Sequence, residues 1–138
     1  GGVANNSQHP IAMNPYQLIG MPYRLGADPE KHGAADCLSL SRAILRWYGI
    51  NTPDPERSWY RRLKQNDYSI FEEQLELWGE QTSRLELGTV CLSRGNANAY
   101  GLATYFAEQP GWISFVGSEA KWSPIGALEA VKYYCPMR

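Results

Sequence analysis

The spacing of apolar residues changes at Gly79, and this change limits the folds open to the chain. Before Gly79, apolar side chains recur every three or four residues, as they do on one face of an α-helix. After Gly79, short aromatic or β-branched segments alternate with turn residues, a pattern that is typical of strands. Helices first and an antiparallel sheet second predict an α+β domain.

The first half of the sequence predicts four helical segments, over residues 15–20, 36–48, 55–63 and 69–78. The best defined is 36–48, where Asp36 is a plausible N-cap and Gly49 a plausible C-terminal stop. The sequence Ser69-Ile70-Phe71-Glu72 reads as a capping box. Residues 20–35, rich in glycine, proline and charge, are expected to form a loop.

The second half predicts strands over residues 87–92, 100–106, 112–116 and 131–135, with one or two helical turns over 124–130. Residues 1–14 are polar and predict an N-terminal arm, which leaves 15–138 as a single domain. The N-terminal helices, including the one that begins at Cys37, are expected to pack on the C-terminal antiparallel sheet.

Charge and hydropathy exclude several classes of partner. Thirteen basic and fourteen acidic residues give no electrostatic basis for binding nucleic acid or an anionic membrane. No apolar run reaches the length of a membrane span, and no hydrophobic signal core follows the polar start. The Gly-Gly beginning leaves open whether a signal peptide has been lost.

The three cysteines, Cys37, Cys91 and Cys135, contain no C-x-x-C pair, so we expect no zinc site, other metal or cofactor. Cys91 and Cys135 lie in apolar, strand-like surroundings, and whether they are paired stays open. Cys37 differs because it follows Asp36 at a helix N-terminus, where the macrodipole favours the thiolate. Such a nucleophile needs a base, usually histidine, and the chain has only His9 and His32.

The residues around Cys37 form a longer pattern. Gly20-Met21-Pro22-Tyr23-Arg24-Leu25-Gly26 is followed by a charged loop, Gly33, Asp36-Cys37, Leu40 and Gly49-Ile50. This pattern closely resembles the core motif of the NlpC/P60 family of cysteine peptidases, within the papain-like superfamily. Fainter resemblance continues through 87–92, 100–105 and 112–115.

The resemblance implies a papain-like fold and a set of roles. Cys37 matches the nucleophile, and Tyr23 matches the tyrosine whose hydroxyl helps to position the thiolate and the developing oxyanion. Asp36 matches the residue before the nucleophile, where its simplest role is to cap the helix. The oxyanion hole would draw on the Cys37 N–H.

The chain departs from the family at the base. The family histidine falls at Ala99, between Asn98 and Tyr100, and the third polar position falls near Ser114. Neither asparagine nor an ordinary tyrosine accepts a proton near neutral pH. His32, five residues before Cys37, is a candidate substitute, although a solvated loop histidine is the better interpretation. His9, in the polar arm, is a weaker candidate.

Two functions follow from the resemblance. One is a hydrolase, an amidase or endopeptidase that cleaves peptidoglycan stem peptides through a thioester at Cys37. The other is a catalytically inactive domain with a cell-wall-binding or structural role, for example in a phage tail or another assembly. Acyl transfer or deamidation on the same scaffold cannot be separated from hydrolysis by sequence. The resemblance implies an extracellular, periplasmic or virion-associated location.

Overall fold

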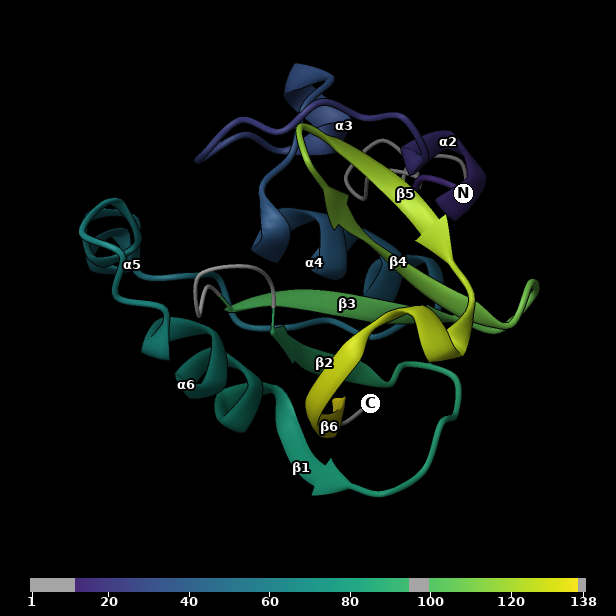
Figure 1. Cartoon of the computed structure of the whole chain (residues 1–138). Coiled ribbons are helices and arrows are strands. Elements are labelled where there is room, and N and C mark those ends of the chain that lie inside the picture. The colour runs from purple at the N-terminus through teal and green to yellow at the C-terminus, as the bar shows by residue number, and fades with distance from the viewer. Residues whose placement is uncertain (1–11, 95–99, 137–138) are drawn as a thin grey trace, which may run out of the picture.

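The computed structural model describes residues 12–94 and 100–136, and Figure 1 shows the order of its elements. The described helices are α2 (Pro15–Leu18), α3 (Pro29–His32), α4 (Cys37–Trp47), α5 (Arg57–Lys64) and α6 (Ser69–Trp78). The described strands are β1 (Gly79–Thr82), β2 (Val90–Arg94), β3 (Tyr100–Phe106), β4 (Gly111–Val116), β5 (Glu119–Ser123) and β6 (Glu129–Pro136). A short 3₁₀ helix, η2 (Ile125–Ala127), precedes β6.

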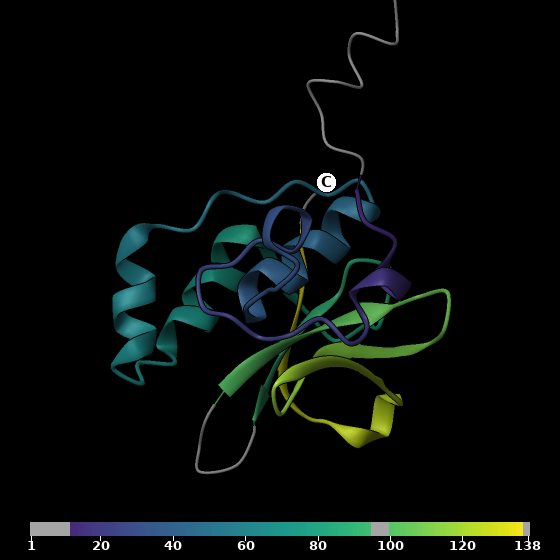
Figure 2. The same cartoon turned by 90° about the horizontal axis from the view of Figure 1, so that it is seen from above.

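The six strands form one antiparallel sheet in the order β1-β6-β2-β3-β4-β5. The last strand therefore returns to lie between the first two. Viewed from above, the longer helices lie over one face of this sheet (Figure 2). Helix α4 packs on β3 and β4, while α6 packs on β1, β6 and β2. This arrangement confirms the predicted α+β class, with the Cys37 helix on an antiparallel sheet.

Alternation along β3 decides which side chains meet α4. Phe106 packs with α4 residues in one buried cluster, and the Thr104 hydroxyl donates to Ser41 Oγ at 2.9 Å. Ala103 points the other way, into a cluster with Cys91 and Trp112 on the opposite face. The buried Thr104–Ser41 bond fixes the position of α4 along β3, and so fixes where Cys37 meets the sheet.

Two expectations about the helical half are wrong. The predicted loop over 20–35 contains the short helix α3, because Asp28 caps it by accepting from the Glu30 N–H and Gly33 ends it in the left-handed conformation. The predicted capping box at Ser69 does not form, since Tyr68 is the N-cap residue and caps with no side chain. The short helix at Pro15 is confirmed but ends at Leu18 rather than at Gly20.

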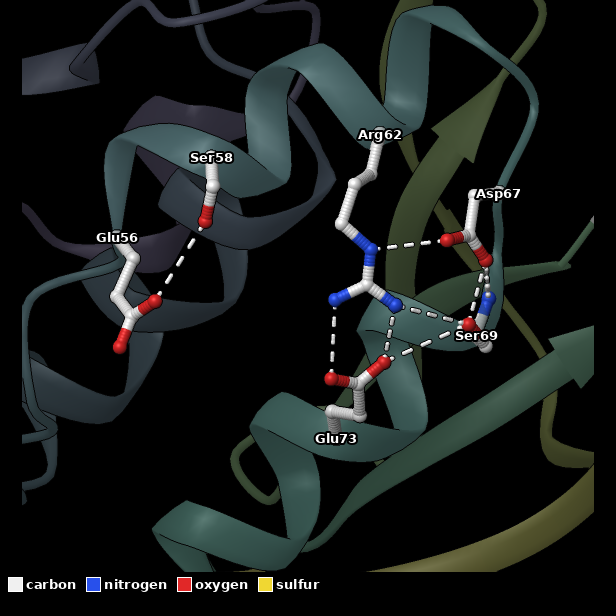
Figure 3. A network of polar contacts seen from close by, with 6 residues as sticks. All are labelled: Glu56, Ser58, Arg62, Asp67, Ser69 and Glu73. Atoms are coloured by element: carbon white, nitrogen blue, oxygen red, sulfur yellow. Dashed lines mark hydrogen bonds and ion pairs between the residues drawn. The ribbon is translucent and has the colours of Figure 1, made fainter.

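Ser69 takes part in a different network, shown in Figure 3. Arg62 at the end of α5 contacts Asp67 Oδ2 through Nε at 2.8 Å, Ser69 Oγ through Nη2 at 3.1 Å, and Glu73 through both Nη atoms. The Ser69 hydroxyl also donates to Asp67. The guanidinium thus holds both chain neighbours of Tyr68 and fixes the turn between α5 and α6.

The strands differ from expectation at their ends. Strands β1 and β5 were not predicted, and the segment predicted from Leu87 forms a strand only from Val90, because Gly88 (φ +91°) makes a turn there. Cys91 lies buried and its thiol is free. Within the described ranges, no helix is long and apolar enough to cross a membrane.

Candidate active site around Cys37

Asp36 caps the helix that carries Cys37, as the sequence predicted. Its Oδ1 accepts from the Ser39 N–H and its Oδ2 from the Gly26 N–H, both at 2.9 Å, while Ser39 Oγ accepts from the Asp36 N–H. The carboxyl is fully buried, and this burial raises its pKa above the ordinary value. Asp36 therefore ties the loop that contains Gly26 to the first turn of α4 and places Cys37 at the helix start.

The Cys37 sulfur lies against the beginning of β3. A Cβ built on Gly101 would stand 4.0 Å from Cys37 Sγ, so the glycine leaves the sulfur close to the strand backbone. The N–H groups of Leu102 and of Cys37 itself lie near enough to this sulfur to lower the pKa of the thiol. The site therefore consists of a partly exposed thiol between a helix N-terminus and a strand N–H.

The environment of Cys37 raises the pKa of its thiol from 9.0 to about 12. Burial is the main cause and the charge of neighbouring Asp36 adds to it, while the Leu102 and Cys37 N–H groups act in the opposite direction. The helix N-terminus still favours the thiolate through the Cys37 N–H, but burial outweighs this effect. The capping carboxylate occupies the same helix N-terminus and opposes the dipole there.

This raised pKa gives a direct prediction for alkylation of Cys37 by iodoacetamide. Only the thiolate reacts, so a pKa of about 12 in place of 9.0 leaves the reactive fraction roughly a thousandfold smaller below pH 9. We expect the alkylation rate to increase about tenfold per pH unit up to at least pH 10. Mass spectrometry of the Cys91→Ser, Cys135→Ser background isolates the Cys37 rate. A plateau near pH 8 would contradict the raised pKa.

Tyr23 is placed beside Cys37 by backbone pairing. Its N–H donates to Ser118 O at 2.8 Å, and it bridges Ala35, two residues before Cys37. Its ring meets Phe115 edge-on at 5.1 Å between centroids and is 40% exposed. Burial first, and then the charge of Cys37, raises the pKa of Tyr23 to about 12. The Tyr23 side chain is therefore a protonated, neutral hydroxyl near the Cys37 thiol.

The other expected site residues lie elsewhere or outside the described ranges. His32 Nδ1 accepts from the Asp28 N–H at 2.9 Å, which ties this exposed ring to its own helix α3. Ser114 follows Ile113 on β4, and neighbouring strand residues face opposite sides of the sheet. Because Ile113 packs toward α4, the Ser114 hydroxyl faces the other side, where it is buried without a hydrogen-bond partner among the described residues. His9 and Ala99 lie outside the described residues. The structure thus brings Cys37, Tyr23 and Asp36 together, and leaves His32 and Ser114 apart from them.

Three residues at the site were not found by sequence reasoning. Gly101 and Leu102 adjoin the sulfur. The sequence predicted the strand at 100–106, but it did not predict which residues of that strand lie against the start of α4, because their alignment depends on tertiary packing. Tyr68 lies near enough to raise the pKa of Tyr23. No pattern in the sequence marks Tyr68, because its place depends on the turn between α5 and α6. In the described part of the chain, no group of three or more histidine, cysteine, aspartate or glutamate side chains could hold a metal ion.

Cys37 thus lies at the start of a helix that packs on an antiparallel sheet, which is the arrangement that the resemblance to papain-like domains implied. Among solved structures, the fold is similar to the crystal structure of the NlpC/p60 domain of the peptidoglycan hydrolase SagA. The two superpose with a TM-score of 0.55 over 87% of this chain and 91% of that chain, at 15% sequence identity. No family model and no curated protein matches the sequence. The fold is therefore of the NlpC/P60 type.

Proposed function

We propose that the chain is an NlpC/P60-type cysteine hydrolase, an amidase or endopeptidase that acts on peptidoglycan stem peptides. The observation that carries the proposal is the position of Cys37, a partly exposed thiol at the first turn of α4 with the Leu102 N–H and Tyr23 beside it. The similarity of the fold to a peptidoglycan hydrolase domain supports the substrate class. The proposed domain spans residues 15–138, with residues 1–14 as an arm.

The proposed reaction proceeds in two steps. Cys37 Sγ attacks the amide carbonyl, the S–C bond forms, the C–N bond breaks, and the thiol proton ends on the leaving amine. Water then attacks the thioester carbonyl, the S–C bond breaks, and the thiol regains a proton as the acid leaves. Because its raised pKa keeps Tyr23 protonated, its hydroxyl can donate a hydrogen bond to the oxyanion that forms when the sulfur attacks.

The Tyr23→Phe variant tests this role of the hydroxyl. We expect kcat to fall roughly a hundredfold, as is usual when one hydrogen-bond donor to a developing oxyanion is removed, with KM little changed. The measurement follows the release of new amino groups from soluble peptidoglycan fragments. Tyr16→Phe, an exposed tyrosine on α2, is the matched control and should keep full activity. Equal rates for both variants would exclude Tyr23 from stabilising the oxyanion.

A second candidate function is a catalytically inactive domain that binds cell-wall peptide or serves in an assembly. The observation in its favour is the raised pKa of Cys37, together with the absence, in the described ranges, of a histidine or carboxylate that accepts a hydrogen bond from this thiol. An inactive domain would bind stem peptides but release no amine from them, even over days at high protein concentration. Measurable turnover that depends on Cys37 would eliminate it.

A further inference from the structure

Gly101 leaves a small space beside Cys37, and a serine hydroxyl borders the same space. A Cβ built on Gly101 would stand 3.8 Å from Ser93 Oγ and 4.0 Å from Cys37 Sγ, which are ordinary van der Waals distances. Apart from the chain neighbours of Gly101, no other atom of the described residues comes within 4 Å of that point. We call this space the Gly101 gap. It is wide enough for a methyl group and separates the nucleophilic sulfur from the Ser93 hydroxyl.

Strand pairing holds Ser93 at the Gly101 gap. Ser93 pairs with Gly101 across β2 and β3, and its hydroxyl donates to Gly101 O at 3.3 Å. The next pair, Arg94 with Tyr100, is joined by a side-chain hydrogen bond of 3.3 Å and by the guanidinium over the tyrosine ring. Because the strand carbonyl takes the Ser93 hydroxyl proton, the lone pairs of Oγ remain to accept a hydrogen bond.

A β-bulge lies at the same residue. Leu92 pairs with Lys132 of β6, but Ser93 pairs with Ala130, so the register between β2 and β6 shifts at Ser93. Bulges of this kind re-aim side chains and are common next to active sites. Ser93 is only half-buried at this bend. The irregularity of β2 therefore coincides with the residue that borders the Gly101 gap.

We propose that Ser93 is a further catalytic residue, which holds in the Gly101 gap the water that hydrolyses the Cys37 thioester. The water donates a hydrogen bond to Ser93 Oγ, and its oxygen attacks the thioester carbonyl carbon. The S–C bond breaks with its electron pair on sulfur, and a water proton passes to that sulfur, which restores the thiol and releases the acid. Ser114 faces the other side of the sheet and does not reach this gap. The role rests on the proposed hydrolase, because it assigns the water of the second step of that reaction.

Loss of an acetyl group from Cys37 tests this step without peptide cleavage. The Cys91→Ser, Cys135→Ser chain is acetylated with p-nitrophenyl acetate, the reagent is removed, and mass spectrometry of the peptide that contains Cys37 follows acetyl loss near neutral pH. We expect Ser93→Ala to slow acetyl loss roughly tenfold, as is usual when one hydrogen bond is removed, and to leave the acetylation rate unchanged. Ser58→Ala, an exposed serine on α5, is the matched control and should change neither rate.

Gly101→Ala tests the gap itself, because its methyl group would take the place of the water. Gly101 has no positive φ, and the added methyl would meet its neighbours at ordinary contact distances, so we expect an unchanged urea midpoint. Acetyl loss should nevertheless slow roughly tenfold, as in Ser93→Ala. Gly126→Ala, where a Cβ meets no atom within 4 Å, is the matched control and should keep the parent rate.

Equal rates of acetyl loss in the parent chain and Ser93→Ala, or in Gly101→Ala and Gly126→Ala, would overturn the water site. A parallel fall in the acetylation rate of Ser93→Ala would overturn it too, because it would mark a structural effect. The result is separable from the proposed function. Acetyl loss that depends on Ser93, in a chain that releases no amine from peptidoglycan fragments, keeps the water site and removes the peptide substrate. Amine release by a chain whose acetyl loss is independent of Ser93 keeps the hydrolase and removes the water site.

Discussion

Replacing Cys37 with alanine is expected to reduce hydrolysis of stem peptides to the uncatalysed background. The proposed thioester cannot form without the sulfur, and removal of a catalytic nucleophile costs on the order of a thousandfold or more in kcat. Alanine keeps the helix start intact, because the Asp36 cap depends on the backbone of Ser39 and Gly26 rather than on the thiol. Release of amino groups from peptidoglycan fragments, followed by chromatography, gives both rates.

The matched control for this loss is Cys91→Ala. Cys91 has a pKa raised to about 12 by burial, as Cys37 has, but it lies on the opposite face of the sheet with Ala103 and Trp112. Its removal should leave kcat unchanged apart from any effect on stability. Should Cys37→Ala retain the parent rate, the thioester mechanism is wrong. Should both variants lose activity together, the loss reflects the fold rather than the nucleophile.

Local patterns in the sequence were sufficient to predict the helix that carries Cys37. Apolar spacing and the Asp36 cap predicted α4, and the structure places this helix at Cys37–Trp47. They were not sufficient for β1 and β5, whose sequences Gly79–Thr82 and Glu119–Ser123 are largely polar. These two strands lie at the sheet edges and are held by pairing with β6 and β4. Such pairing partners are remote or depend on the whole sheet, so local propensity does not reveal them.

The candidate site, like the fold, was predicted from the sequence only in part. The motif located Cys37, Tyr23 and Asp36, which the structure brings together around one sulfur. It did not reveal the thiol's raised pKa, because burial and the direction of the Asp36 carboxylate are tertiary properties. It also did not reveal that His32 turns back to the Asp28 N–H, since that bond depends on the short helix α3. The sequence motif thus singles out Cys37, while the pKa of its thiol depends on tertiary packing.

A second large effect is expected from Gly79→Ala, at the junction where α6 ends and β1 begins. A Cβ on Gly79 would lie 2.1 Å from Cys135 O and 2.6 Å from Pro136 Cα, so the backbones of β1 and β6 must separate. Its extended backbone (φ −176°) suits any residue, so the cost is the clash itself. Overpacking against backbone costs about 3 kcal/mol of unfolding free energy, which a fall in the urea midpoint would report.

Gly126→Ala in η2 is the matched control, because a Cβ there meets no atom within 4 Å and the change should stay within about 0.5 kcal/mol. Equal urea midpoints for the two variants would show that β1 and β6 do not approach as closely as described. The clash also reaches α6, because α6 is continuous with β1 and carries Glu72, which contacts Lys132 of β6. Separation of β1 from β6 would therefore disturb the ion pair between Glu72 and Lys132 and, with it, the packing of α6 on the sheet.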